Sequence, residues 1–168
     1  MEYQTPFDVA KYMCSLIPAD THTILEPTPG EGNILKYLNN YDVTAPVNIF
    51  DLKPQLFDCI IMNPPFSSKY AYGIPNDFEY KGMQLGYYIL SECMKMSEHI
   101  IALMPWFTIS DSDVRLRAIK SFGLKSLTAL PRKTFQYARI QTCILELSKG
   151  YSDKTTFHVF DLINRVSF

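Results

Sequence analysis

The stretch of sequence that decides the fold reads Phe57-Asp58-Cys59-Ile60-Ile61-Met62-Asn63-Pro64-Pro65-Phe66. Its first six residues are mostly apolar and end before proline, which cannot extend a β-ladder, so they predict a buried strand. The two prolines hold the next residues extended, and Pro64 also restricts the backbone of Asn63. Ligands bind beyond the carboxyl ends of strands in open α/β sheets, so we expect a ligand site at residues 63–66.

These four residues offer a substrate two hydrogen-bond acceptors and one aromatic ring. A planar nitrogen can donate one N–H to the side-chain oxygen of Asn63 and another to the carbonyl of Pro64, while Phe66 stacks on its π-face. Both acceptors stabilise positive charge that develops on the nitrogen as it attacks an electrophile. The alternative is a plain strand-to-loop turn that contains two prolines.

Asn-Pro-Pro-Phe after a Phe-Asp-x-Ile-Ile strand resembles motif IV of the S-adenosylmethionine-dependent amino methyltransferases, especially the N6-adenine DNA methyltransferases. The resemblance implies that Asn63, Pro64, Pro65 and Phe66 are catalytic and that Asn63 also lies beside the cofactor. It implies direct attack of the target nitrogen on the sulfonium methyl of S-adenosylmethionine, without a metal. The same tetrapeptide serves enzymes that methylate guanine in RNA or glutamine in protein.

An earlier segment, Thr5-Pro6-Phe7-Asp8, predicts the start of a helix, with Thr5 as its cap and Pro6 at the first helical position. Pro18 is expected to end this helix. Thr-Pro-x-x-Val-Ala-x-Tyr-Met resembles motif X of the adenine methyltransferases. In that family the threonine helps to hold the methionine carboxylate of the cofactor, so the resemblance implies this role for Thr5 and favours adenine in DNA as the substrate.

The next segment, residues 23–33, predicts a short strand, a Gly-x-Gly turn and a helix that carries Ile34, Leu35 and Leu38. Glycines allow positive φ and close approach of the backbone to a ligand. A dinucleotide-binding fingerprint would need a third glycine, which is missing here. Glu-Pro-x-x-Gly-x-Gly instead resembles motif I of the methyltransferases. The resemblance implies cofactor contacts from Glu26, Pro27, Gly30 and Gly32, with the acid serving the methionyl ammonium; the alternative is that the glycines are turn residues.

The resemblance weakens between Gly32 and Asn63, which are separated by residues 33–62. Residues 41–45 and 47–51 predict two short strand-like stretches, whereas family members place two strands and a helix here. Asp51, at the end of the second stretch, is our candidate for a cofactor contact, and Asp42 is the weaker alternative for the ribose. A solvated turn acid beside Lys53 explains Asp51 nearly as well.

The rest of the chain alternates helices and strands. We expect helices over residues 79–97 and 111–122, with Gly123 as the C-terminal cap of the second. Strands are expected over 99–105, continued by Trp106 and Phe107, and over 125–130, 143–147 and 155–161, the last as an edge strand.

Substrate contacts are expected from three segments. Leu130-Pro131-x-x-x-Phe135, followed by a Thr-x-Ile-Leu-x-Leu strand, resembles motif VIII, whose aromatic residue lines the pocket for a flipped base; this implies such a role for Phe135, and a core position is the alternative. Residues 67–77, with Lys69, predict a loop beside the active site. Arg132 and Lys133 belong to a basic C-terminal third that suits phosphate contacts, although the solvated face of a helix and a hairpin is the slightly favoured interpretation.

The composition predicts one globular domain. Of 168 residues, 47% are hydrophobic and 20% charged, and the net charge of −1 gives no basic signature that would indicate nucleic acid. The four cysteines lack a Cys-x-x-Cys pair and the three histidines lack metal-ligand spacing, so we expect buried thiols and no metal. Without a long apolar run or a signal-like start, we expect a cytoplasmic protein without membrane contact.

The motifs together imply a Rossmann-like class I methyltransferase over residues 1–168: a mostly parallel twisted sheet, an antiparallel C-terminal hairpin strand and helices on both faces. The activity they favour is N6-adenine methylation of a flipped-out base in DNA, as in restriction–modification systems. We see no separate target-recognition domain, so a specificity subunit or a homodimer is the expected partner. Methylation of RNA guanine or protein glutamine is the alternative, and a non-catalytic cofactor-binding or interaction subunit is the second.

Overall fold

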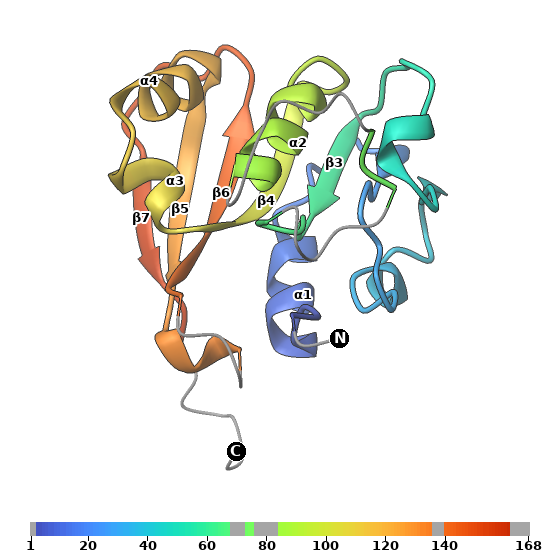
Figure 1. The fold of residues 1–168 in the computed structure, drawn as a ribbon, viewed down its shortest axis with the longest axis horizontal. Helices are drawn as coiled ribbons and strands as arrows, with labels where there is room; N and C mark the ends of the chain where they lie inside the picture. Colours follow the sequence, from blue (N-terminus) through green and yellow to red (C-terminus); the bar gives the residue numbers. More distant parts are fainter. Residues whose placement is uncertain (1–2, 68–72, 76–83, 136–139, 162–168) are drawn as a thin grey trace.

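The computed structural model describes residues 3–67, 73–75, 84–135 and 140–161. Within them, seven strands form one sheet in the order β2-β1-β3-β4-β6-β5-β7 (Figure 1). The strands are β1 (Thr23–Leu25), β2 (Asp42–Thr44), β3 (Cys59–Met62), β4 (His99–Pro105), β5 (Leu124–Leu130), β6 (Thr142–Ser148) and β7 (Thr156–Val159). The helices are α1 (Phe7–Ser15), α2 (Leu85–Cys93), α3 (Phe107–Ser110) and α4 (Asp113–Phe122), and the 3-10 turns are η1 (Leu35–Tyr37), η2 (Ile49–Asp51) and η5 (Arg132–Thr134).

The strand directions confirm the expected fold class. β2, β1, β3 and β4 pair in parallel, whereas β6 runs antiparallel to both β4 and β5. In Figure 1 the arrow of β3 points down and that of β6 points up. β7 pairs in parallel with β5 and forms the expected edge strand.

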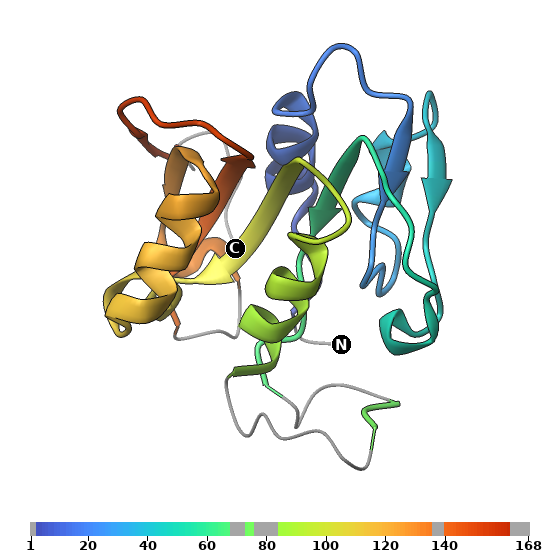
Figure 2. The same cartoon turned by 90° about the horizontal axis from the view of Figure 1, so that it is seen from above.

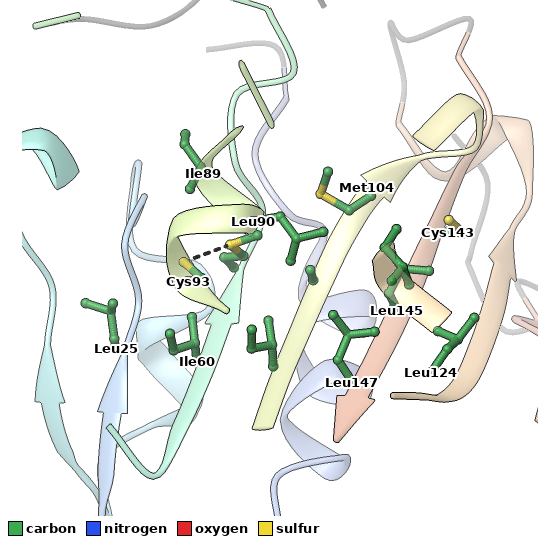
Figure 3. Packing of buried hydrophobic residues seen from close by; sticks show 14 of the residues in the cluster. Leu25, Ile60, Ile89, Leu90, Cys93, Met104, Leu124, Cys143, Leu145 and Leu147 are labelled. Carbon is green, nitrogen blue, oxygen red and sulfur yellow. Dashed lines mark hydrogen bonds between the residues drawn. The ribbon is translucent and has the colours of Figure 1, made fainter. Parts of the chain in front are cut away.

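Helices cover both faces of the sheet, as expected. Figure 2 shows α1 on one face and α2 and α4 on the other. On the α2 face, Ile89, Leu90 and Cys93 pack against strand residues that include Ile60 and Leu145 (Figure 3). On the α1 face the buried cluster contains Val9, Ala10, Met13, Ile61 and Leu103. Because β3 and β4 are covered on both faces, they are near-continuous apolar runs rather than alternating ones.

The segment between the glycine turn and Asn63 is short, and two predictions for it are wrong. The expected helix around residues 34–38 is the single 3-10 turn η1, in which Leu38 N bonds Leu35 O at 3.0 Å. The chain then turns at once into β2, which leaves no length for a helix. The expected strand at residues 47–51 is the 3-10 turn η2, because the Asn48 side chain accepts a hydrogen bond from Phe50 N at 3.0 Å and bends the backbone.

Three element boundaries also differ from expectation. Thr5 is not the cap of α1: the helix begins at Phe7, its N-cap position is Pro6, and it has no side-chain cap. The strand expected over 99–105 is confirmed as β4, but Trp106 and Phe107 do not extend it, because Ile109 N bonds back to Trp106 O at 3.1 Å and α3 begins. α2 ends at Cys93 rather than residue 97, since the next turn tightens: Lys95 N bonds Glu92 O at 3.1 Å and Met96 N bonds Cys93 O at 2.9 Å.

The second predicted helix is confirmed at both ends. Ser112 is the N-cap of α4, and its side chain accepts from Arg115 N at 3.3 Å. Gly123 follows the helix with φ 137°, and a Cβ there would overlap the carbonyl of Ser148. Most of the expected loop at residues 67–77, and residues 79–83 of the expected helix, lie outside the described residues.

The expectation of buried cysteines is confirmed at three of the four positions. Cys59, Cys93 and Cys143 are buried, and Cys14 is half-buried. Burial raises the pKa of the Cys59 and Cys143 thiols to about 12, so both stay protonated at neutral pH and are poor nucleophiles. In the part of the chain that the structure describes, no helix is long and apolar enough to cross a membrane.

Candidate active site

The strand order places Glu26 and Asn63 at the carboxyl ends of two neighbouring strands. Glu26 directly follows β1, Asn63 directly follows β3, and these two strands pair in parallel with Leu25 opposite Ile60. From β1 the chain goes outward to β2, whereas β3 leads to β4 on the other side. The two residues therefore lie at the topological switch point, where open α/β sheets bind ligands.

The N-terminal segment (residues 3–5) holds the side chain of Asn63. The amide nitrogen Nδ2 donates to the hydroxyl of Thr5 at 3.0 Å and to the carbonyl of Tyr3 at 3.1 Å. Thr5 is 4% exposed. No residue in the described ranges donates a hydrogen bond to Asn63 Oδ1 or to the Pro64 carbonyl. These are the two acceptors that the sequence predicts for a substrate nitrogen.

Glu26 is a buried carboxyl group without a cationic partner among the described residues. It is 1% exposed, and burial raises its pKa to about 8, although hydrogen bonds from Thr28 lower it. The backbone N–H of Thr28 donates to Oε1 at 3.0 Å. A buried carboxyl group in this state favours a ligand that brings positive charge, such as an ammonium group.

The glycine turn (residues 28–33) carries the expected backbone conformation. Gly30 and Gly32 have φ of 53° and 81°, in the left-handed region that favours glycine. The side chain of Gln4 packs against Gly30, and its Oε1 accepts from Glu31 N at 3.0 Å. Asn33 Nδ2 donates to the carbonyl of Thr5 at 2.9 Å. The turn and the N-terminal segment are thus joined at two points.

The stretch Asn63-Pro64-Pro65-Phe66, here called the proline shelf, is supported from the α2 side by Gly86. A Cβ at Gly86 would lie 3.4 Å from the carbonyl of Pro65 and 3.5 Å from Cα of Phe66. The absence of a side chain therefore lets the first turn of α2 approach the shelf closely. The Phe66 ring is half-buried and packs on the apolar cluster of the α1 face.

Phe135 lies in the same apolar cluster as Phe66. It is 7% exposed, so the structure places it in the core, the alternative that its sequence position left open. Arg132 and Lys133 form η5 directly after β5 and are exposed. Because β5 runs in the same direction as β3, Arg132 and Lys133 lie at the same end of the sheet as Asn63, where the parallel strands have their carboxyl ends. Lys69 lies outside the described residues.

The two candidate acids for the cofactor ribose are not at the end of β2. Asp51 is exposed on η2, which follows β2 by several residues. Asp42 pairs with Thr23 at the amino ends of β2 and β1. The glycine turn follows the carboxyl end of β1, so this register places Asp42 too far away to contact a ribose bound there. β2 ends at Thr44, and no carboxylate directly follows it.

A cavity of about 410 Å³ lies between η2 and α2. It is lined by Ile49 and Phe50 on one side and by Tyr88 and Ile89 on the other. The rings of Phe50 and Tyr88 stack with their centroids 6.2 Å apart. The cavity does not include Glu26 or the proline shelf.

Sequence reasoning missed four residues that build this site: Tyr3, Gln4, Thr28 and Asn33. The first two precede a helix start and act through a carbonyl and an amide, which no motif marks. Thr28 and Asn33 lie inside the glycine stretch, at positions that the motif leaves unspecified. The sequence did offer one signal for such residues. A polar side chain at a position that the motif leaves unspecified, close to a carboxyl group that needs a hydrogen-bond partner when buried, is a candidate for that partner.

Comparison with solved structures identifies proteins of the same fold. The methyltransferase subunit of a type I restriction–modification system from Streptococcus thermophilus matches 94% of this chain with a TM-score of 0.71 and 15% identity. A modification subunit assigned to a type I restriction enzyme of Vibrio vulnificus matches 97% with a TM-score of 0.67 and 16% identity. A protein of Listeria monocytogenes assigned as a class I S-adenosylmethionine-dependent methyltransferase matches 98% with a TM-score of 0.70 and 16% identity.

The chain therefore has the Rossmann-like fold of class I methyltransferases. It corresponds to 47% and 48% of the two restriction–modification subunits, so it spans about half the length of these proteins, and to 68% of the Listeria protein. No protein-family model matches the sequence. A search of curated proteins likewise finds no match.

Proposed function

We propose that this chain is an S-adenosylmethionine-dependent amino methyltransferase that acts on the N6 group of adenine in DNA. The observation that carries the proposal is the placement of Asn63 and Glu26 on adjacent strand ends at the switch point. One presents an acceptor for a substrate nitrogen, and the other is a buried acid for a ligand cation.

The residues present fit the cofactor at its methionyl end. Glu26 would hold the ammonium group, because a nearby cation offsets the cost of ionising this buried carboxyl group. The glycine turn would take the adjacent backbone contact, and Thr5, Pro27 and Asp51 remain the other candidates for cofactor contacts. When bound, S-adenosylmethionine supplies an electrophilic methyl group on a sulfonium centre.

The chain's own contribution to the reaction is to orient and desolvate the target nitrogen. Asn63 Oδ1 and the Pro64 carbonyl accept its two N–H bonds, which directs its lone pair and stabilises the positive charge it acquires. Pro65 keeps the backbone extended, and Phe66 stacks on the base. Holding a nucleophile in this way lowers the barrier mainly through orientation. Phe135, Lys69, Arg132 and Lys133 are the proposed substrate contacts; RNA guanine and protein glutamine present similar planar nitrogens and remain the alternative substrates.

The proposed function includes a partner subunit. Two of the structural neighbours are described as subunits, and this chain spans about half of each. Because these two neighbours are described as subunits, we propose that a separate specificity subunit or a homodimer reads the DNA sequence. Without that partner, we expect methyl transfer with little sequence preference.

Transfer of labelled methyl from S-adenosylmethionine to DNA, RNA and protein, followed by nucleoside analysis for N6-methyladenine, tests the proposal. Asn63→Ala should abolish transfer and leave cofactor binding within about threefold in calorimetry, since its acceptor oxygen faces the substrate. Transfer by Asn63→Ala at the rate of the wild-type chain would refute the mechanism. Label in RNA or protein alone would select the alternative substrates.

One observation favours a second function, a non-catalytic cofactor-binding or interaction subunit. β2 ends without a carboxylate and Asp42 lies at the opposite end of the strands, so of the two candidate acids only Asp51 on η2 is left for a ribose contact. Calorimetry with S-adenosylmethionine separates the two functions. Binding without transfer to any acceptor supports a cofactor-binding subunit, and absence of binding supports an interaction subunit.

A further inference from the structure

The N-terminal segment fixes which end of the Asn63 amide faces the substrate side. Nδ2 lies 3.1 Å from the carbonyl of Tyr3 and 3.0 Å from the hydroxyl of Thr5. A carbonyl oxygen accepts hydrogen bonds and never donates them, so the atom facing Tyr3 must be the NH2 group. Both hydrogens of this group are then used inside the protein, and Oδ1 is left as the acceptor that faces away from the N-terminal segment.

We propose that Thr5 is a positioning residue that locks the Asn63 amide with its oxygen toward the substrate. The inference rests on the proposed function of Asn63 and extends it to the residue that orients it. Thr5 acts through Asn63 and is therefore separate from the role in cofactor binding that its motif implies. With Oδ1 and the Pro64 carbonyl both acceptors, the proline shelf takes a group that donates two hydrogen bonds, such as a ring amino group, and rejects a ring carbonyl.

Thr5 is itself held firmly enough to do this. It is 4% exposed, and its carbonyl accepts from Asn33 Nδ2 at 2.9 Å. The preceding residue, Gln4, is tied to Glu31 N at 3.0 Å. Both tethers belong to the glycine turn. The orientation of Asn63 is therefore set by the same turn that the proposed cofactor would contact.

The Thr5 hydroxyl can also donate a hydrogen bond of its own. It accepts from Asn63, so its own proton points to another atom, and no acceptor for that proton is found among residues 3–67, 73–75, 84–135 and 140–161. A ligand oxygen at the start of α1 would complete its bonding. In that arrangement one buried hydroxyl contacts the ligand and the substrate-orienting amide together.

The test is nuclear magnetic resonance of the Asn63 side-chain amide in the full chain, with its signals assigned by their loss in Asn63→Ala. Thr5→Val removes the acceptor at nearly constant volume, Thr5→Ser keeps it, and Thr156→Val on exposed β7 is the matched control. Loss of one neutral hydrogen bond should speed exchange of one Asn63 amide hydrogen by about five- to tenfold in Thr5→Val. We expect wild-type exchange in Thr5→Ser and Thr156→Val. An unchanged Asn63 amide in Thr5→Val overturns the inference.

Methyl-transfer kinetics provide the second measurement. A misdirected amide should lower kcat about 10- to 100-fold in Thr5→Val, with rescue by Thr5→Ser. Full kcat in a folded Thr5→Val chain would also overturn the inference. If the wild-type chain transfers methyl to no acceptor, the proposed function fails, while the amide exchange still decides whether Thr5 holds Asn63.

Discussion

The hydroxyl of Thr28 donates a hydrogen bond to the main-chain carbonyl of Asn63 at 3.3 Å, and this bond joins the glycine turn to the proline shelf. The backbone N–H of the same threonine donates to Glu26 Oε1 at 3.0 Å. Thr28 therefore contacts both residues that define the candidate site, through the side chain of Glu26 and the main chain of Asn63. The proposed cofactor end and the proposed substrate end of the site are therefore joined directly by Thr28.

Thr28→Val tests this link. The valine keeps the backbone bond to Glu26 and removes the donor to Asn63, so the free energy of unfolding should fall by about 1 kcal/mol, the usual value of such a bond. Urea denaturation measures this effect. Thr28→Ser, which keeps the hydroxyl, should match the wild type, and equal stability of the valine variant would show that the bond contributes nothing.

Glu26 should make stability depend on pH. Its pKa is about 8 in the folded chain against an ordinary value of 4.5, so between these values the folded state retains a proton that the unfolded state has released. The unfolded state then binds fewer protons, and the free energy of unfolding falls as pH rises from about 4.5 to 8. Glu26→Gln should flatten this decline in urea denaturation across that range. A decline of the same size in the glutamine variant would assign the effect to another group.

The same group should release a proton when a cationic ligand binds. An ammonium beside Glu26 favours the carboxylate and lowers its pKa, so binding below pH 8 expels the proton that burial retains. Calorimetry of S-adenosylmethionine binding at pH 6.5, in two buffers of different ionisation enthalpy, should detect about one released proton. Glu26→Gln should bind more weakly and release none; a wild-type chain that binds without proton release would contradict the assignment of Glu26.

Much of this architecture follows from local sequence because the decisive signals are local. Buried apolar runs bounded by proline located β3 and β4, and Gly123 located the end of α4 because its backbone conformation and its contact with Ser148 both exclude a side chain. The positions of Asn63 and of the glycine turn were predicted from the residue types that follow the predicted strands. The strand order that brings them together could be expected from the fold class, since parallel strands share an edge.

What sequence could not supply depends on contacts between distant segments. Thr5 was expected to cap α1, but its hydroxyl is engaged by Asn63, and the helix begins later. Residues 47–51 were expected to be strand-like, yet one hydrogen bond from Phe50 N to the Asn48 side chain bends them into η2. A stretch of five residues is too short for its strand preference to outweigh such a local bond.

Gly86 should be replaceable by alanine and by little else. An alanine Cβ would lie 3.4 Å from the Pro65 carbonyl and 3.6 Å from Met104 Cε, which are ordinary contacts, and alanine is the better helix former. Gly86→Ala should therefore raise the free energy of unfolding by up to about 1 kcal/mol and retain activity. Gly86→Leu should displace the proline shelf and lower both the free energy of unfolding and the methyl-transfer activity. Thermal unfolding and methyl transfer check the pair; a tolerated leucine would show that α2 does not support the shelf.

Phe135 and Phe66 share an apolar cluster but should respond differently to truncation. Phe135 is 7% exposed, so Phe135→Ala should cost about 3–5 kcal/mol of unfolding free energy, as expected for a core phenylalanine. Phe66 is half-buried at the shelf, so Phe66→Ala should cost less stability while lowering methyl transfer through lost stacking on the base. Phe135→Leu, which keeps most of the volume, separates packing from base contact. If Phe135→Leu is stable yet loses transfer, Phe135 contacts the substrate as its motif implies; if it is stable and active, its role is confined to the core.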